Sequence, residues 1–419
     1  MLKIYLFAVL FFVPSISYAY LDPGTGNALV FFIITFVGSV LYYLKRFFYK
    51  VFFRKNAGES KPTDKQLVIF SEGKSYWYTF KPIIEELIAQ NVPFRYLTTD
   101  VEDPALDVNS PLMEARFVGS GASAYARIAR SRGKLFLVTT PNIGCDGYPL
   151  KRPAKIEKMI HVTHSVSDIT YYKLGSLDNY DVVMDVGDWC EDSIRKTEKL
   201  RNLKKKEFLS VGLPYLDEFA KKALAKKYMS EPYTVLIAPS WGVKGALSVF
   251  GTQFVLDILN AGFNVIFRPH PQSWVAEKDL LDSLVEKACS FKNFTLDKNV
   301  SNTETMNQSD ILISDSSSVR YDFAFLYKKP VITMDVPAAD LSSFEASVLG
   351  GAWDQNLAND LGVVVKKGEE AELPNTIKKV LTSDFEDTRA KIEKLYDSLI
   401  ANHGTSAKHV VQWIKDQGL

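Results

Sequence analysis

The chain has 419 residues, of which 47% are hydrophobic, and this is enough to build two α/β domains beside a membrane segment. Its 50 lysines and arginines nearly balance its 49 aspartates and glutamates, so no global positive field is available to hold a polyanion. We therefore expect a folded enzyme and no nucleic-acid partner. The three cysteines, Cys145, Cys190 and Cys289, lack CxxC spacing, which argues against a zinc site or a disulfide framework.

The N-terminus has the pattern of a signal segment followed by a membrane anchor. Within residues 1–19, Lys3 precedes an apolar stretch at 4–13, and Ser17-Tyr18-Ala19 places small residues at cleavage-type positions. A second apolar run occupies residues 28–44. At about 17 residues it reaches the lower limit for crossing roughly 30 Å of hydrocarbon. The run is predicted to be a transmembrane anchor.

A basic juxtamembrane linker, residues 45–61, follows the anchor. Its cations are Lys45, Arg46, Lys50, Arg54 and Lys55. By the positive-inside rule this flank lies in the cytoplasm. We therefore expect the protein in the inner (cytoplasmic) membrane, with its catalytic domain facing the cytoplasm. Two topologies stay open, namely a cleaved signal with one anchor and an uncleaved hairpin of two helices.

From residue 62 onward, short apolar runs alternate with amphipathic stretches, which is typical of parallel sheets with helices on both faces. The first series predicts strands at 67–70, 94–97, 135–139, 159–162, 182–184 and 208–211, with helices at 81–89 and 122–130. A lysine-rich helix is predicted at 219–227. The second series predicts strands at 234–238, 264–267, 311–313, 331–334 and 363–365, and a final helix at 407–417.

The two series predict the fold class α/β, with an N-terminal α/β domain at 62–215 that would bind an acceptor and a C-terminal α/β domain at 230–385 that would bind a donor. C-terminal helices are expected at 386–419. Each domain is expected to be a doubly wound Rossmann-type fold, and the two are expected to face one another across a cleft.

Two polar segments of the second series follow predicted strands. Arg268-Pro269-His270-Pro271 comes after the strand at 264–267, and the serine-rich run from Ser314 to Asp322 comes after the strand at 311–313. In open α/β sheets, ligands collect at the carboxyl ends of the strands. A hydroxyl-rich loop that leads into a helix offers backbone N–H groups to an anion, and Arg and His supply further donors. Together the segments predict a phosphate site.

These same segments, together with Lys329-Pro330-Val331-Ile332, resemble the CDP-glycerol:poly(glycerophosphate) glycerophosphotransferases, membrane-associated enzymes that build teichoic-acid-like polymers. The resemblance extends to 211–217, to 236–241 and to Val162-Thr163-His164-Ser165, and it covers roughly residues 155–415. It implies a GT-B fold, a CDP-linked polyol such as CDP-glycerol as donor, and a membrane-linked polymer or lipid as acceptor. It also implies no metal and no further cofactor.

The implied reaction moves a polyol phosphate to an acceptor hydroxyl and releases CMP. Its catalysis is mainly positioning and neutralisation of charge on phosphoryl oxygens. His164 is the candidate base for the hydroxyl proton, and His270 is a candidate donor to the leaving oxygen. Arg268 is expected to bind two diphosphate oxygens. The remaining oxygens are assigned to Ser316, Ser317 and Ser318.

Four further residues are assigned supporting roles. Asp315 is interpreted as a helix cap or as an orienter of a His or Arg side chain. Asp322 is interpreted as a structural partner of Arg268 or of a backbone amide. Ser240 and Trp241 are expected to line the cleft near the nucleotide, although Trp241 fits the core equally well.

Alternative interpretations of these residues stay open. His164 also fits a structural hydrogen-bond donor, and Arg268 also fits an ordinary salt bridge in a surface turn. The serines fit helix capping, which is compatible with phosphate binding. The family's His-Gly-Thr-Pro-Leu-Lys is replaced here by His164-Ser165-Val166-Ser167-Asp168, which puts the acceptor geometry and the polyol in question.

Three functions fit the sequence. The first is polyol-phosphate transfer from a CDP-linked donor. The second keeps the fold but uses a nucleotide sugar, as a glycosyltransferase or an epimerase. The third is a non-catalytic membrane-bound assembly protein with a vestigial site. The presence of Arg268, His270 and His164 together favours an enzyme.

Overall fold

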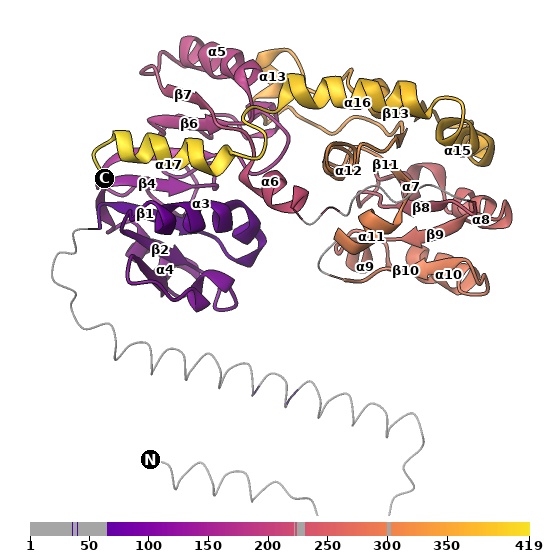
Figure 1. Ribbon diagram of the computed structural model, residues 1–419, viewed down its shortest axis with the longest axis horizontal. Helices are drawn as coiled ribbons and strands as arrows, with labels where there is room; N and C mark the ends of the chain where they lie inside the picture. The colour runs from indigo at the N-terminus through magenta and orange to yellow at the C-terminus, as the bar shows by residue number, and fades with distance from the viewer. Residues whose placement is uncertain (1–35, 37–39, 41–64, 222, 224–230, 300–302) are drawn as a thin grey trace, which may run out of the picture. The chain divides into compact units, whose positions relative to one another are not determined.

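The computed structural model describes residues 36, 40, 65–221, 223, 231–299 and 303–419 (Figure 1). The chain divides into two units, Met1–Thr63 and Asp64–Leu419. Of the first unit only Phe36 and Val40 are described; both are helical and exposed. The predicted signal segment, the rest of the predicted anchor and the basic linker lie outside the described residues. Among the residues that are described, no helix is long and apolar enough to cross a membrane.

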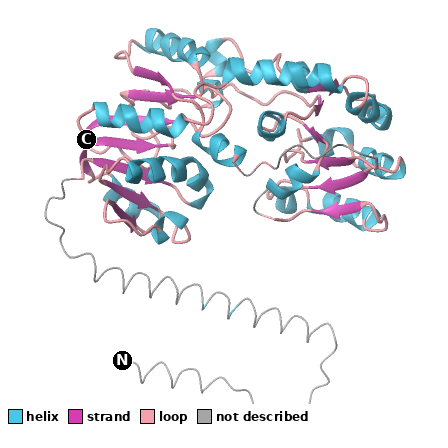
Figure 2. Cartoon of the chain, in the orientation of Figure 1, coloured by secondary structure: helices cyan, strands magenta, loops and turns pink. Residues whose placement is uncertain are grey.

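The second unit contains two entirely parallel sheets with helices around them (Figure 2). The first sheet has seven strands in the order β3-β2-β1-β4-β5-β6-β7. Their bounds are β1 Leu67–Ser71, β2 Phe94–Thr98, β3 Met113–Phe117, β4 Arg132–Val138, β5 Lys155–Val162, β6 Val182–Asp185 and β7 Glu207–Ser210.

The central strand β1 shows why this sheet is covered on both faces. All five of its residues are buried, as expected for a strand in the middle of a parallel sheet. Leu67 and Ile69 enter one core, together with residues of α3 (Trp77–Ala89) and α17 (Ser406–Asp416). Val68 and Phe70 enter the opposite core, to which α4 (Gly121–Ile128) and α5 (Glu191–Arg201) contribute.

The second sheet has six strands in the order β10-β9-β8-β11-β12-β13. Their bounds are β8 Thr234–Ile237, β9 Asn264–Phe267, β10 Phe294–Leu296, β11 Ile311–Ser314, β12 Val331–Met334 and β13 Gly362–Val365. Val235 and Ile237 of β8 face one core, and Leu236 between them faces the other. The alternation again buries both faces of a parallel sheet.

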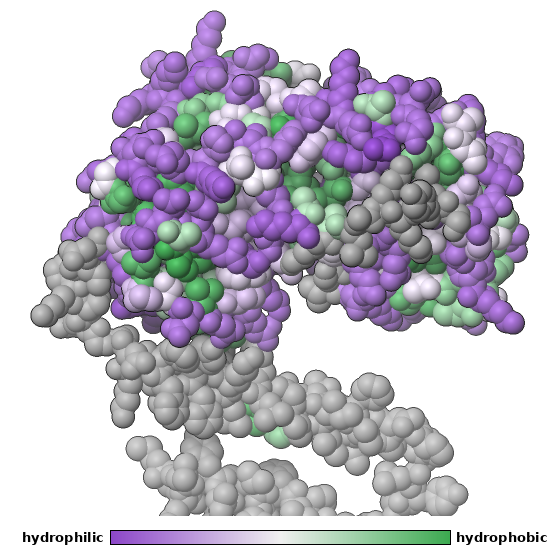
Figure 3. All heavy atoms as spheres, viewed as in Figure 1, coloured by the Kyte–Doolittle hydropathy of each residue, from purple (hydrophilic) through white to green (hydrophobic). Residues whose placement is uncertain are grey.

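The remaining helices connect and cover these strands. They are α6 Pro214–Ala220, α7 Ala246–Phe250, α8 Gln253–Asn260, α9 Ser273–Ala276, α10 Lys278–Ala288, α11 Thr303–Gln308, α12 Val319–Tyr327, α13 Ala346–Leu349, α14 Ala358–Leu361, α15 Leu373–Leu381 and α16 Phe385–Leu399. The core of the second sheet's inner face includes α6, α12 and α16, along with Val186 and Leu213 of the N-terminal part. Hydrophobic side chains are thus largely internal, and the face seen in Figure 3 is mainly hydrophilic.

The chain passes between the two sheets twice. It leaves the first sheet after β7 and returns at its C-terminal end, where α17 places Val410, Trp413 and Ile414 in the same core as α3. Gly212, at the first passage, has a φ of 87° and lies so close to Ala401 that a Cβ there would be 2.2 Å from the Ala401 carbonyl oxygen. Only glycine fits this contact between the outgoing and the returning chain.

Every predicted strand is present, and two of the observed strands were not predicted. β3 and β10 have no counterpart in the sequence prediction; β3 buries only Met113, and β10 has three residues, none of them fully buried. The helix α6 begins at Pro214, a residue well suited to a first helical turn, and ends at Ala220, so it overlaps only the start of the helix predicted at 219–227. Most of residues 221–230 lie outside the described part.

Strand order fixes where each sheet can bind a ligand. In both sheets the order reverses beside the first strand of the series, between β1 and β4 in the first and between β8 and β11 in the second. Loops that leave the two strands at such a switch point run in opposite directions and open a crevice at their carboxyl ends, where ligands bind. The structure therefore has two candidate crevices, one in each sheet.

Candidate active site

The predicted donor-site residues lie along one edge of the second sheet. Arg268 and His270 follow β9, Ser240 and Trp241 follow β8, and residues 315–318 follow β11. Because β8 lies between β9 and β11, the Arg268 loop and the serine loop are two strand spacings apart, or about 10 Å. The loops after β8 and β11 flank the switch point itself, with Arg268 and His270 immediately beside it.

Asp315 holds the two loops of this crevice together. Its side chain is fully buried, and it accepts hydrogen bonds from the backbone N–H of Ser240 at 3.0 Å and of Ala246 at 2.8 Å. Ala246 is the first residue of α7, so Asp315 caps that helix from a distant loop. Ser314 adds a bond from its hydroxyl to the Ala238 carbonyl at 2.6 Å. Asp315 is thus a structural acceptor for amides, and no His or Arg is among its partners in the described part of the chain.

The serine loop presents unused donors at the start of α12. Ser317 accepts a long bond from the Val319 amide, at 3.4 Å, whereas Ser318 makes no side-chain capping bond. Within the described chain, the backbone N–H groups of Ser316, Ser317 and Ser318 donate to no protein group. The side chains of Ser316 and Ser318 are exposed. Three successive amides at a helix N-terminus, with hydroxyls beside them, form a site suited to a phosphate.

Arg320, which the sequence analysis did not single out, fixes this loop from behind. Its buried guanidinium donates to the Ser317 carbonyl at 3.1 Å and pairs with Asp354 at 3.4 Å. Asp354 also accepts bonds from Tyr321 at 3.1 Å and from Tyr171 at 2.5 Å. Arg320 lies within the serine-rich run, so its role could have been predicted from the sequence. The role of Asp354 could not, because Asp354 lies in a separate loop far along the chain.

Arg268 has a carboxylate partner that sequence reasoning also missed. Its Nη1 pairs with Asp297, which follows β10 and whose side chain is 2% exposed. The Arg268 side chain is 19% exposed, so the guanidinium is held at the sheet edge while part of it reaches solvent. Removing Arg268 would leave a buried carboxylate unpaired, so its loss would affect folding as well as any ligand.

His270 is exposed and stacks on Trp241, with ring centroids 6.1 Å apart and an interplanar angle of 25°. Its Nδ1 accepts a hydrogen bond from the Gln272 amide at 3.1 Å. Burial lowers the pKa of His270, against a smaller raising effect of Glu277. The neutral ring therefore carries its proton on Nε2, which makes that nitrogen a donor. Trp241 is 49% exposed, and so belongs to the surface rather than the core.

His164 follows β5, at the carboxyl edge of the first sheet. Its ring meets Tyr76 edge-on, with centroids 5.1 Å apart and an interplanar angle of 83°. Burial lowers the pKa of His164 to about 4, so the imidazole is neutral near pH 7, and the same burial disfavours its protonated form. Its Nδ1 is buried and has no hydrogen-bond partner among the described residues. His161, on the same strand, instead bonds Tyr172 through Nε2 at 2.8 Å.

Asp322 does not pair with Arg268, contrary to expectation; it accepts a hydrogen bond from Tyr215 at 2.6 Å. Tyr215 lies on α6, and burial raises the pKa of Asp322 to about 6 while the Tyr215 bond opposes that change. The pairing with Arg268 fails because Arg268 is engaged across the sheet edge by Asp297. Asp322 instead ties α12 to the segment that joins the two sheets.

The His164 loop and α12 are joined by a continuous set of contacts. Tyr171, seven residues beyond His164, bonds Asp354, the same carboxylate that holds Arg320. Nearby, the Thr170 hydroxyl accepts a bond from the Trp353 amide at 3.2 Å. The candidate base and the phosphate loop therefore belong to one connected structure.

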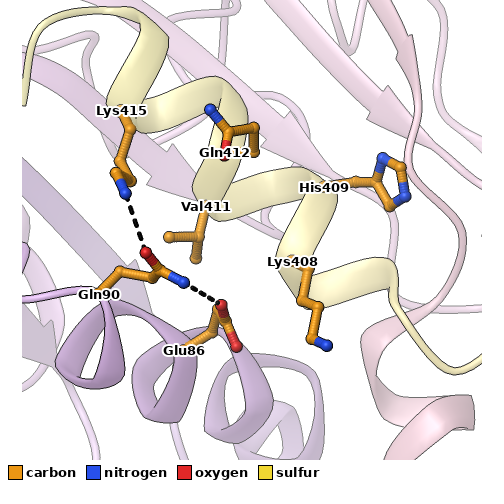
Figure 4. Close-up of a pocket in the computed structure, with 7 residues that line it drawn as sticks. All are labelled: Glu86, Gln90, Lys408, His409, Val411, Gln412 and Lys415. Atoms are coloured by element: carbon orange, nitrogen blue, oxygen red, sulfur yellow. Dashed lines mark hydrogen bonds between the residues drawn. The ribbon is translucent and has the colours of Figure 1, made fainter.

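A surface groove between α3 and α17 is a separate feature (Figure 4). Lys415 donates to Gln90 at 2.9 Å, and Gln90 donates to Glu86 at 3.0 Å. Because α3 starts at the carboxyl edge after β1, its last turn lies near the opposite edge of the sheet. The groove is therefore distant from the switch-point loops. Its lining residues are Glu86, Gln90, Lys408, His409, Val411, Gln412 and Lys415.

The described residues contain no group of three or more His, Cys, Asp or Glu side chains placed to hold a metal ion. All three cysteines are free thiols.

Comparison with known proteins identifies the family. The sequence model described as CDP-Glycerol:Poly(glycerophosphate) glycerophosphotransferase matches residues 148–416. The chain belongs to this family. It is therefore a transferase, and the match includes His164, Arg268, His270 and the serine loop. No protein with a curated description matches the chain.

Solved structures resemble this glycerophosphotransferase-family chain over most of its length. The wall teichoic acid polymerase TagF is 19% identical, with a TM-score of 0.53 over 91% of this chain and 98% of that chain. A TagF variant with one histidine replaced by asparagine, soaked with CDPG, gives 17% identity and a TM-score of 0.54, covering 91% and 97%. UDP-GlcNAc 2-epimerase from Neisseria meningitidis, bound to UDP-GlcNAc, is 11% identical. Its TM-score is 0.55, over 84% of this chain and 100% of that chain. These similarities establish a GT-B-like fold.

Proposed function

We propose that this protein is a membrane-anchored transferase that moves a polyol phosphate from a CDP-linked donor to a membrane-linked acceptor. The donor we propose is CDP-glycerol, the acceptor a growing cell-surface polymer or its lipid-linked precursor, and the released product CMP. The observation that carries the proposal is that the backbone N–H groups of residues 316–318 donate to no protein group in the described chain. They lie at the second sheet's switch point, in a chain that belongs to this family.

The proposed step is an in-line displacement at phosphorus. An acceptor hydroxyl oxygen attacks the outer phosphorus of the donor, the bond from that phosphorus to the bridging oxygen breaks, and CMP leaves with the bonding electron pair. The hydroxyl proton passes to His164, whose ring is neutral in the free protein and whose protonated form is stabilised by the negative charge of the bound diphosphate. Charge on the phosphoryl oxygens is met by the amides at 316–318, by Arg268 and by the Nε2 proton of His270. The transfer changes no oxidation state, so it needs no oxidant or reductant.

The membrane part of the proposal rests on the sequence. The apolar run at 28–44 and the cations at 45–55 support an anchor with the catalytic part on the cytoplasmic side. A CDP-linked donor is an activated metabolite of the cytoplasm, so this orientation would place the donor crevice where the donor is made.

The test is to identify the nucleotide that is released. The full-length chain in detergent is incubated with a membrane extract and, separately, CDP-glycerol, CDP-ribitol and a panel of UDP-sugars. We expect CMP with a CDP-polyol and no nucleotide from UDP-sugars. His164→Ala should lower CMP release by about a hundredfold or more, the usual scale of losing a general base. His409→Ala, which removes an exposed histidine of α17, serves as the matched control and should behave like the wild type.

Release of UDP or UMP instead, with the CDP-polyols ignored, would contradict the proposal and favour a nucleotide-sugar enzyme on the same fold. Equal rates in His164→Ala and the wild type would remove His164 from the mechanism while leaving the donor assignment intact.

A further inference from the structure

The crevice of the first sheet, between β1 and β4, is lined by residues on both sides of the start of the family match at residue 148. Glu72 directly follows β1, and Tyr148 lies in the long loop that follows β4. The switch point of a doubly wound sheet is the place where a ligand enters between two such loops. The second sheet's crevice is assigned to the donor, so the first sheet's crevice is open to the other substrate.

Glu72 is a half-buried carboxylate surrounded by phenols rather than by cations. Its Oε1 accepts a hydrogen bond from the Tyr148 hydroxyl at 3.1 Å. It also lies beside Tyr76, whose pKa is raised first by burial and then by Glu72. Within the described chain, no lysine, arginine or histidine pairs with Glu72. A partly buried carboxylate is stabilised by further hydrogen-bond donors, and a hydroxyl-rich ligand supplies them.

The loop that carries Glu72 is held in place by hydrogen bonds within the turn and to the loop after β2. The Glu72 carbonyl accepts a bond from Thr99 at 2.9 Å, and Ser71 closes a tight turn by bonding the Gly73 carbonyl at 3.0 Å. Gly73 has a φ of 149°, and a Cβ there would lie 2.6 Å from the Asp100 Cβ. Only glycine fits, so the backbone sets the position of the carboxylate before any ligand arrives.

Tyr76 connects this carboxylate to the candidate base. It lies in the short 3-10 helix Lys74–Tyr76 that the Glu72 loop leads into, and its ring packs edge-on against His164 at 5.1 Å. One tyrosine thus contacts both Glu72 and His164. Tyr76 therefore links the loop after β1, which carries the carboxylate, to the loop after β5, which carries the base.

We propose that Glu72, supported by Tyr148, is a specificity-determining residue that binds the acceptor hydroxyl adjacent to the attacking one. The ligand class is a polyol chain end with two neighbouring hydroxyls: one loses its proton to His164 as it attacks phosphorus, and the other donates a hydrogen bond to Glu72. Tyr76 is a positioning residue that holds the imidazole against the crevice wall. This inference rests on the proposed function, because it assigns the acceptor side of the same reaction.

The test compares two synthetic acceptors, an alkyl glycerol phosphate and an alkyl 1,3-propanediol phosphate, which lacks the middle hydroxyl. Full-length wild type with CDP-glycerol should prefer the glycerol acceptor by about tenfold or more in kcat/KM, the effect of one hydrogen bond to a charged group. Glu72→Gln should lower kcat/KM for the glycerol acceptor at least tenfold and leave the propanediol acceptor within about twofold. The selectivity should therefore disappear, with the KM for CDP-glycerol unchanged.

The variants are chosen to separate recognition from folding. Gln retains an acceptor for the Tyr148 hydroxyl, so the loop should stay folded; Tyr148→Phe should give a smaller loss of the same selectivity. Glu102→Gln, which removes an exposed carboxylate paired with Lys74 on the neighbouring loop, is the matched control and should keep wild-type selectivity.

Full selectivity in Glu72→Gln would overturn this inference while the transferase proposal stands. A wild type that releases no CMP from CDP-glycerol with either acceptor would overturn the proposed function itself, and this inference with it.

Discussion

At the scale of single residues, burial decides what each candidate side chain is able to do. His164 is kept neutral because its ring is largely removed from water, and the phenol ring of Tyr76 packs edge-on against it. Asp315 is buried against backbone amides and so has a structural role, whereas Ser316 and Ser318 are exposed beside unused amides. Arg268 is oriented by Asp297 before any donor arrives. The site is therefore largely pre-organised.

One prediction concerns the protonation of His164. With histidine selectively labelled, we expect the NMR signal of His164 to show no titration above pH 5, because burial lowers its pKa to about 4. His164→Gln assigns the signal among the five histidines of the chain. Addition of CDP-glycerol should raise the pKa, since the negative diphosphate favours the imidazolium. A titration near the ordinary value of 6.5 in the free protein would contradict the described burial.

The sign of the stability effect follows from the same shift. Between pH 6.5 and about 4 the unfolded chain binds a proton at His164 and the folded chain does not. The free energy of unfolding is therefore highest above pH 6.5 and falls as the pH is lowered toward about 4.

At the scale of elements, α12 and the loop before it form the phosphate cradle. The nine-residue helix α12 begins beside the switch point. Arg320 holds that end of the helix in place through its bond to the Ser317 carbonyl and its ion pair with Asp354. Three amides before the helix remain unused by the protein in the described chain. Backbone groups, rather than the serine hydroxyls alone, are thus expected to bind the donor phosphate.

Two substitutions at Ser318 separate the amide from the hydroxyl. Ser318 has a φ of −63°, which proline also adopts. We expect Ser318→Ala to weaken CDP-glycerol binding by about two- to tenfold and Ser318→Pro, which lacks the N–H, by about ten- to a hundredfold. Calorimetric binding measures both, and thermal unfolding checks that the loop accepts proline. Binding by Ser318→Pro as tight as by Ser318→Ala would show that this amide is not used.

Sequence reasoning succeeds for elements whose pattern is local. Strands of the sheet interior such as β1, β9 and β11 appear in the sequence as short apolar runs, so their positions were predictable. The Arg268 loop after β9 and the serine loop after β11 were predictable with them. The edge strands β3 and β10 bury little and leave no such run. The partners Asp297, Asp354 and Tyr215 were not predictable, because each meets its site residue across a strand edge or a domain connection rather than along the chain.

At the scale of the whole molecule, the two crevices are tied into one connected unit. Arg201 of the N-terminal part bonds Asp178 at 2.7 Å and Glu345 of the C-terminal part at 2.8 Å, and Lys173 forms an isolated bridge with Phe344. Together with the Tyr171–Asp354 and Tyr215–Asp322 bonds, these contacts link the His164 loop to α12. A reaction that joins two substrates needs such a connection, because small displacements between base and phosphate cost much of the rate.

The most direct test of the central claim is a count of products from one reaction. CDP-glycerol labelled in both the cytidine and the glycerol is given to the full-length chain with alkyl glycerol phosphate as acceptor, and CMP and glycerol phosphate joined to the acceptor are measured together. We predict one CMP for every glycerol phosphate transferred, with both products lost together in His164→Ala. CMP without matching incorporation would indicate hydrolysis, and release of CDP would indicate transfer of glycerol without its phosphate; either result would contradict the account.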